Sequence, residues 1–190
     1  LNVMDTRDGS PSGIAKSQRQ GVAPSIAFGL NEPTTIVFSH HYLRERNRPD
    51  LGVPYDPNTH RPLDVPVERY YGVEGLNHED IDTNISTIRL THKLSEQGNL
   101  NAQLRHGRYD RLVLVTAPRL VNTSTTNPVT EKTDISRSGK LRGSLNETTA
   151  FTLDYTDKFD DGTFRHQLLA GLEVVRDTQY ATSITTNGTI

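Results

Sequence analysis

The sequence predicts an all-β fold, an antiparallel up-and-down sheet that forms a segment of a transmembrane β-barrel, and three observations predict it. Apolar residues alternate with small or polar residues over long stretches, which is the period-two pattern of β-strands. The strands that this pattern defines have about 12 to 17 residues, against roughly 5 or 6 in soluble proteins. Short turns also alternate with long polar connections, as do the short periplasmic turns and long extracellular loops of membrane barrels.

The first hairpin runs from 18–30 to 34–47, and residues 1–4 before it end an earlier strand. Its turn, Asn31-Glu32-Pro33, contains residues that favour tight turns. One parity of the hairpin carries the large apolar side chains Ile26, Phe28, Leu30, Ile36 and Phe38. The other parity carries small, mostly polar residues, so the two faces of this hairpin are predicted to meet different surroundings.

Pro24 lies inside the first of these strands. It has no N–H group to donate to a ladder, and a closed barrel has no free edge at which to accommodate it. The sequence therefore predicts a bulge at Pro24, or a point at which the ladder has already opened.

Two further hairpins follow the same pattern. The second runs from 83–94 to 100–115, and the third runs from 143–159 to 163–177. One parity of each hairpin is mainly leucine, isoleucine, phenylalanine and valine, while the other carries charged residues in mid-strand. With the truncated strand at the start, the chain is predicted to contribute about seven strands.

Long polar segments at 5–17, 48–82 and 116–142 are predicted to connect the hairpins. A soluble β-sandwich or a β-solenoid adhesin is the alternative, because such folds also show alternation. A sandwich buries its apolar face and has short loops at both ends. A membrane barrel turns its apolar face to lipid and its polar face to a lumen. The long strands and the unequal connections favour the barrel.

Composition excludes several function classes. The chain has 190 residues, a formal net charge of -2 and no cysteine, so it indicates neither a nucleic-acid-binding protein nor a disulfide scaffold. No apolar run approaches the roughly 20 residues of a membrane-spanning helix. Both ends, Leu1 and Ile190, read as cuts, so we expect a partial barrel domain over 1–190, with further parts outside it.

Five blocks of sequence resemble TonB-dependent siderophore receptors. The first, GVAPSIAFGL at 21–30, resembles the APSxAFGL strand of that family. The others are NRPDLGVPY at 47–55, RPLDVP at 61–66, LRHGRYDR at 104–111 and HQLLAGLE at 166–173. They follow the family's order along nearly the whole chain, and the branch that they resemble most is the ferric catecholate receptors. The turn at 31–33 departs from the family's Gly-Thr-Pro, which should alter the turn but not the fold.

The resemblance implies a barrel of about 22 strands in the bacterial outer membrane. In that family a plug domain fills the barrel; it and the C-terminal strands are expected outside this chain. The resemblance further implies active uptake of a ferric siderophore, energised through the TonB complex, and no enzymatic activity. Iron would enter as the ferric siderophore complex, so we expect no cofactor and no protein-bound metal. The expected surroundings are outer-membrane lipid and lipopolysaccharide, and no nucleic acid is expected as a partner.

Basic and aromatic residues at the outer ends of two strands are candidates for siderophore binding. They are Arg46 and Arg48 in the first hairpin, and Arg105, Arg108, Tyr109 and Arg111 in the second. Ferric tris-catecholates are anionic and aromatic, and guanidinium groups and tyrosine rings suit such a ligand through charge and stacking. The alternative is a solvated rim that pairs with acidic neighbours or with lipopolysaccharide phosphates.

Tyr55, Tyr70 and Tyr71 lie in the longest connection and are candidates to close over the same ligand. The alternative is that these rings pack the loop against itself.

No residue pattern indicates catalysis or a metal site. His40 and His41 are adjacent, so they point to opposite faces of a strand and cannot easily share one ion. Asp157 and His166 are predicted to be cross-strand neighbours in the third hairpin and to form a modest pair.

The leading hypothesis is a segment of an outer-membrane receptor that takes up ferric siderophore. A passive porin-like barrel and a soluble β-rich adhesin or binding module are the alternatives. A plug domain would separate the receptor from a passive porin, and detergent dependence would exclude the soluble module.

Overall fold

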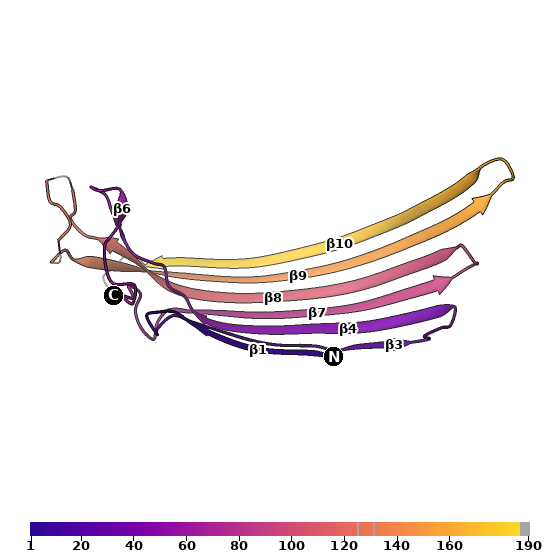
Figure 1. Ribbon diagram of the computed structural model, residues 1–190, viewed down its shortest axis with the longest axis horizontal. Coiled ribbons are helices and arrows are strands. Elements are labelled where there is room, and N and C mark those ends of the chain that lie inside the picture. Colours follow the sequence, from indigo (N-terminus) through magenta and orange to yellow (C-terminus); the bar gives the residue numbers. More distant parts are fainter. Residues whose placement is uncertain (125, 131, 187–190) are drawn as a thin grey trace.

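A single curved antiparallel sheet makes up most of the protein (Figure 1). The computed structural model describes residues 1–124, 126–130 and 132–186. The sheet runs in the order β1-β2-β4-β7-β8-β9-β10, and β3 also pairs with β4. Because each long strand lies beside the next one along the chain, the predicted up-and-down antiparallel fold is confirmed.

The main strands are β1 (Asn2–Gly9), β2 (Lys16–Ala23), β3 (Ser25–Phe28), β4 (Thr34–Arg48), β7 (His78–Lys93), β8 (Asn99–Leu120), β9 (Ile135–Asp160) and β10 (Arg165–Thr186). The short strands β5 (Tyr55–Asp56) and β6 (Arg61–Pro62) form a separate hairpin within the longest loop.

β2 and β3 occupy one strand position, which is interrupted at Pro24. β2 pairs with β4 as Val22↔Tyr42, and β3 continues in the same register. No residue is inserted, and pairing with β4 resumes at Ser25, so both predicted forms, a bulge and a ladder that has already opened, are wrong. The His40 N–H donates to the Pro24 carbonyl at 3.1 Å, and proline lacks the N–H that would complete this pair. The ladder loses one donor here, and the sheet has the seven strand positions that the sequence predicts.

At the loop end, the strands extend beyond the apolar alternation. β1 continues to Gly9, β8 continues to Leu120, and β9 begins at Ile135. The predicted connections are therefore too long, and the observed ones are 10–15, 49–77 and 121–134. The first of them is a short turn. Backbone pairing requires no apolar side chain, so the ladder continues where the sequence pattern has already faded.

Short turns close the opposite end of the sheet, at 29–33, 94–98 and 161–164. In the first turn, Gly29 has a φ of 71° and Asn31 has a φ of 69°. A Cβ atom at Gly29 would lie 2.1 Å from the Thr34 carbonyl oxygen, so this position requires glycine. The predicted turn at Asn31-Glu32-Pro33 is confirmed.

One face of the sheet, which we call the outer face, is apolar near the short turns. Its register aligns Ile26, Phe38, Ile88, Leu104, Phe151 and Val174 in one row across the strands. These side chains are 37% to 58% exposed. Among the described residues, the buried apolar side chains are Ala15, Tyr71 and Val113. An apolar face without a packed layer suits contact with lipid, whereas a soluble sandwich would bury it.

The opposite face, which we call the inner face, is polar over the same stretch of strand. Its neighbouring row contains Arg89, Gln103, Thr152 and Glu173. Arg89 donates from Nε and Nη2 to Gln103 Oε1, at 3.2 and 2.9 Å. Over the ranges that the structure describes, no helix is long and apolar enough to cross a membrane.

Candidate functional site

The continuous register assigns each candidate residue to a face, because side chains two residues apart in a strand share a face. Arg46, Arg48 and Arg108 belong to the outer face, and Arg105, Tyr109 and Arg111 belong to the inner face. Tyr55, Tyr70 and Tyr71 lie in the loop 49–77. The structure therefore divides the predicted set among three places rather than bringing it together.

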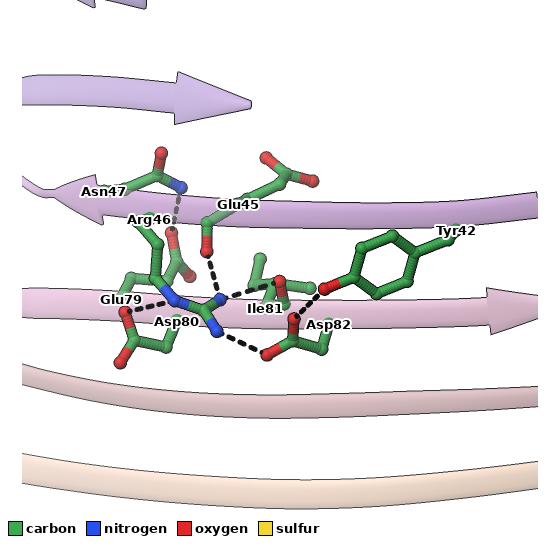
Figure 2. A network of polar contacts seen from close by, with 8 residues as sticks. All are labelled: Tyr42, Glu45, Arg46, Asn47, Glu79, Asp80, Ile81 and Asp82. Carbon is green, nitrogen blue, oxygen red and sulfur yellow. Dashed lines mark hydrogen bonds and ion pairs between the residues drawn. The ribbon is translucent and has the colours of Figure 1, made fainter. Parts of the chain in front are cut away.

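Arg46 is the centre of a polar network on the outer face (Figure 2). Its Nη2 donates to Asp82 Oδ2 at 2.6 Å, and its Nε lies 3.5 Å from Asp80 Oδ1. Its Nη1 donates to the Ile81 carbonyl at 3.1 Å. The Tyr42 hydroxyl donates to the other oxygen of Asp82 at 3.3 Å. Two carboxylates and the carbonyls of Glu45 and Ile81 thus occupy the donors of Arg46, and the carboxylates neutralise its charge.

Arg48 and Arg108 are also paired with carboxylates. Arg108 Nη1 donates to Glu147 Oε1 at 2.8 Å, and its Nη2 lies 3.9 Å from Asp110. Arg48 Nη1 lies 3.8 Å from Glu74. All three outer-face arginines share a face with the apolar row, so their arrangement fits a solvated rim better than one siderophore site.

On the inner face of β8, Arg105 and Tyr109 lie two residues to either side of Gly107. Arg105 is exposed, and no hydrogen-bond or ion-pair partner for it occurs within residues 1–124, 126–130 and 132–186. The ring of Tyr109 lies over Gly107, where a Cβ atom would come within 3.0 Å of the ring. Gly107 thereby leaves room for an aromatic ring that lies along the inner face.

Arg111 is held by a chain of polar contacts that crosses β2, β4, β7 and β8. Its Nε and Nη2 donate to Glu79 Oε1 at 2.9 and 2.6 Å. Glu79 Oε2 accepts a hydrogen bond from Asn47 Nδ2 at 3.3 Å. Asn47 Oδ1 in turn accepts one from the Ser17 hydroxyl at 2.8 Å. Both oxygens of Glu79 are therefore engaged, and Arg111 is fixed in position.

The tyrosines of the longest loop have different surroundings. Tyr55 is 55% exposed. The Tyr70 hydroxyl donates to the Pro49 carbonyl at 3.1 Å, and burial raises the pKa of this hydroxyl above its usual value. Tyr71 is only 4% exposed, and its carbonyl accepts a hydrogen bond from Arg137 Nε at 2.8 Å. Tyr70 and Tyr71 thus pack the loop, while Tyr55 keeps a surface that a ligand could reach.

Asn77 anchors the same loop to β8, a role that the sequence did not indicate. Asn77 is 3% exposed, and its Oδ1 accepts hydrogen bonds from the Thr116 N–H at 2.9 Å and the Thr116 hydroxyl at 2.7 Å. The Thr116 Oγ1 accepts a further bond from the Val73 N–H at 2.9 Å. These contacts join residues far apart in sequence, so only the strand register could have revealed them.

A hollow lies between the loop 49–77 and the loop 121–134. Apolar side chains of both loops line it, among them Leu63, Tyr71 and Val129. None of the predicted arginines contributes to its walls.

His40 and His41 point to opposite faces of β4, as the sequence predicts. His40 lies on the outer face, with its Nδ1 2.9 Å from the Ser86 hydroxyl. His41 pairs with Ile85 and points to the inner face. Within the described part of the chain, no group of three or more histidine, cysteine, aspartate or glutamate side chains is arranged to hold a metal ion.

The predicted pairing of Asp157 with His166 is wrong. The register places His166 opposite Phe159, and the two rings stack with centroids 4.8 Å apart. His166 Nε2 instead lies 2.9 Å from Asp161 Oδ2 in the adjacent turn. Asp157 pairs with Leu168 in the register, and its carboxylate accepts a hydrogen bond from the Tyr155 hydroxyl at 2.8 Å.

Comparisons with known proteins agree with this architecture. No family model matches the sequence. The chain is 27% identical over 183 residues to the probable TonB-dependent siderophore receptor PiuA of Acinetobacter baumannii, covering 91% of this chain and 23% of that protein. It is 26% identical over 195 residues to the catecholate siderophore receptor Fiu of Escherichia coli K12, covering 94% of this chain and 25% of Fiu.

Solved structures of the same receptors are also similar. The crystal structure of PiuA from Acinetobacter baumannii matches with a TM-score of 0.78 and 26% identity, covering 94% of this chain and 26% of that one. The open form of the ferric-catecholate import receptor Fiu from Escherichia coli K12 matches with a TM-score of 0.78 and 25% identity, covering 94% of this chain and 29% of that one.

These similarities confirm the predicted resemblance to TonB-dependent siderophore receptors and the antiparallel all-β fold of a barrel segment. Receptors of this kind are outer-membrane proteins of Gram-negative bacteria, which confirms the predicted location. The chain spans about a quarter of the length of these relatives, 23% of one and 25% of the other. The relatives are receptors rather than enzymes.

Proposed function

From the likeness to siderophore receptors, we propose that this chain serves the uptake of ferric siderophore across the bacterial outer membrane, as active transport energised through TonB. The observation that carries the proposal is the extent of the likeness, since 91% to 94% of the chain aligns with siderophore receptors. The two-faced sheet supports it, because lipid can meet the apolar outer face while an aqueous interior meets the inner face.

A ferric catecholate is the proposed cargo. Fiu is named as a catecholate receptor and aligns with 94% of this chain. Exposed Arg105 and the oriented ring of Tyr109 on the inner face suit an anionic, aromatic chelate. Iron is then cargo that arrives within its chelator, and we propose no resident cofactor and no catalytic step.

Lipopolysaccharide is the proposed neighbour of the outer face. Arg46 and Arg108 lie there beyond the apolar row, where phosphate groups of the outer leaflet would be within reach. Their carboxylate partners keep the net charge of this region low. To bind a lipopolysaccharide phosphate, each arginine would have to exchange its carboxylate partner for the phosphate.

Uptake of radioactive iron tests the proposal. The full-length protein is produced in cells that lack their own catecholate receptors, and uptake of ferric tris-catecholate is measured with and without an intact TonB complex. We expect uptake that requires both the protein and TonB. Uptake that persists without TonB would indicate a passive porin-like barrel. No uptake, with wild-type surface expression, would refute the proposed cargo.

A further inference from the structure

Three basic residues form a patch at the loop end of the inner face, and two of them were not predicted as site residues. They are Arg111 of β8 and Lys140 and Arg142 of β9, which we call the inner cation patch. The register pairs Val113 with Arg142 and Val115 with Lys140. Arg111 pairs with Ser144, one step along the same face.

This pairing brings the three cations close together. Arg142 is the diagonal neighbour of Arg111, at roughly 7–8 Å between Cα atoms. Lys140 follows Arg142 by two residues on the same face, which is about 7 Å along a strand. Val113 lies between Glu79 and Arg142 in its row and is one of the buried apolar side chains, at 7% exposed.

Two of the three cations, Lys140 and Arg142, have no ion-pair partner among the described residues, whereas Arg111 is paired with Glu79. Glu79, the carboxylate beside it, has both oxygens engaged by Arg111 and Asn47. Lys140 and Arg142 have no carboxylate within 4.0 Å in the part of the chain that the structure describes. Arg142 is exposed and Lys140 is half-buried.

The neighbouring strand adds hydroxyl groups rather than acids. Ser183 and Thr185 of β10 are the partners of Arg142 and Lys140 in the register. The next acidic residue on this face of β10 is Asp177, which is six residues from Ser183 and therefore about 20 Å away. By contrast, Arg46, Arg48 and Arg108 are each paired with a carboxylate.

We propose that Lys140 and Arg142, with Arg111 held beside them, bind a multivalent anion on the inner face. In the proposed function, which this inference rests on, that anion is the ferric catecholate at its entry to the barrel. Arg111 is positioned by Glu79, while Lys140 and Arg142 supply the uncompensated charge. Hydroxyl groups of β10 are available to donate further hydrogen bonds to its oxygen atoms.

Equilibrium binding to the purified full-length protein tests this inference. Two multivalent anions are used as probes, ferric tris-catecholate and inorganic tripolyphosphate, at two salt concentrations. The test variant combines Lys140→Gln and Arg142→Gln, and the charge-retaining variant is Arg142→Lys. The matched control is Arg176→Gln, which removes an exposed charge from the outer face of β10.

We expect the double variant to bind ferric tris-catecholate at least about tenfold more weakly, with a flatter salt dependence, because two charges that contact the anion are lost. The affinities of Arg142→Lys and of the control for ferric tris-catecholate should stay within about threefold of that of the unchanged protein. Equal affinity of the double variant and the unchanged protein for both probes would overturn the inference.

The two probes separate this inference from the proposed function. If tripolyphosphate binding depends on the patch while no ferric chelate binds, the anion site stands and the proposed cargo is wrong. If the unchanged protein binds neither anion, both are wrong.

Discussion

A charge placed on the outer face should destabilise the barrel in the membrane, whereas the same charge one residue further along the strand should have little effect. Phe151 lies in the apolar row between Leu104 and Val174 and is 37% exposed. Phe151→Arg would put a guanidinium group where acyl chains are expected. Thr152→Arg puts the same group on the inner face, between Gln103 and Glu173, where water and a carboxylate are available.

The expected difference follows from the cost of desolvating the charge. An arginine on the lipid face of a barrel costs about 2–4 kcal/mol near the bilayer midplane, while lumen positions tolerate charge. Phe151→Arg should therefore lower the free energy of unfolding by about 2–4 kcal/mol, and Thr152→Arg should change it by less than about 1 kcal/mol. Urea titrations of the full-length protein in phospholipid vesicles measure both values. Equal losses for the two variants, or a larger loss for Thr152→Arg, would refute the assignment of faces.

Three further predictions concern the ladder, the loop and the turn. Pro24→Ala restores the missing donor opposite His40, so its new amide should be protected in hydrogen exchange; rapid exchange would contradict the continuous register. Asn77→Ala removes a buried acceptor and should destabilise the base of loop 49–77 by about 1–3 kcal/mol, seen as faster proteolysis there with the barrel intact; unchanged proteolysis would contradict the anchor. The hydrogen bond from His166 lowers the pKa of Asp161 below its usual 3.8, and the hydrogen bonds from the Phe164 and Thr163 backbone amides lower it further. Ionised Asp161 therefore stabilises the turn fully above pH 3.8, and this stabilisation is lost as the pH falls through the lowered pKa. An NMR titration that gives Asp161 its usual pKa would contradict this prediction.

The alternation of faces could be predicted because it is a local property. Ile26, Phe28 and Phe38 fall on one parity, and the structure keeps that parity on one face because no register shift occurs from β3 to β10. The short turns could be predicted for the same reason, since Gly29 and Asn31 supply the positive φ values within a few residues.

The strand ends could not be predicted. The segments 116–120 and 135–142 belong to β8 and β9, although their side chains no longer alternate between apolar and polar. Pairing there is decided by the partner strand, which a local pattern does not contain.

The candidate site was predicted only in part. Arg46 has the same parity as Phe38 in one unbroken strand, so its outer-face position could have been read from the sequence. The predicted set nevertheless contains residues of both faces, because residues of either parity occur near the loop end of β4 and β8. Arg142 was missed because its proximity to Arg111 depends on the β8–β9 register. The anchor at Asn77 was missed because its contact with Thr116 depends on the β7–β8 register.

Single-cysteine scanning of β8 tests the two-faced sheet most directly, since these 190 residues contain no cysteine and any cysteine elsewhere in the full-length protein is first replaced by serine. Cysteines replace the residues 100–104 one at a time in the full-length protein, and each carries a fluorophore read with a lipid-soluble and a water-soluble quencher. We expect labels at Leu100, Ala102 and Leu104 to be quenched from the lipid, and labels at Asn101 and Gln103 to be quenched from water. Quenching without alternation, or with the two sets exchanged, would contradict the two-faced sheet.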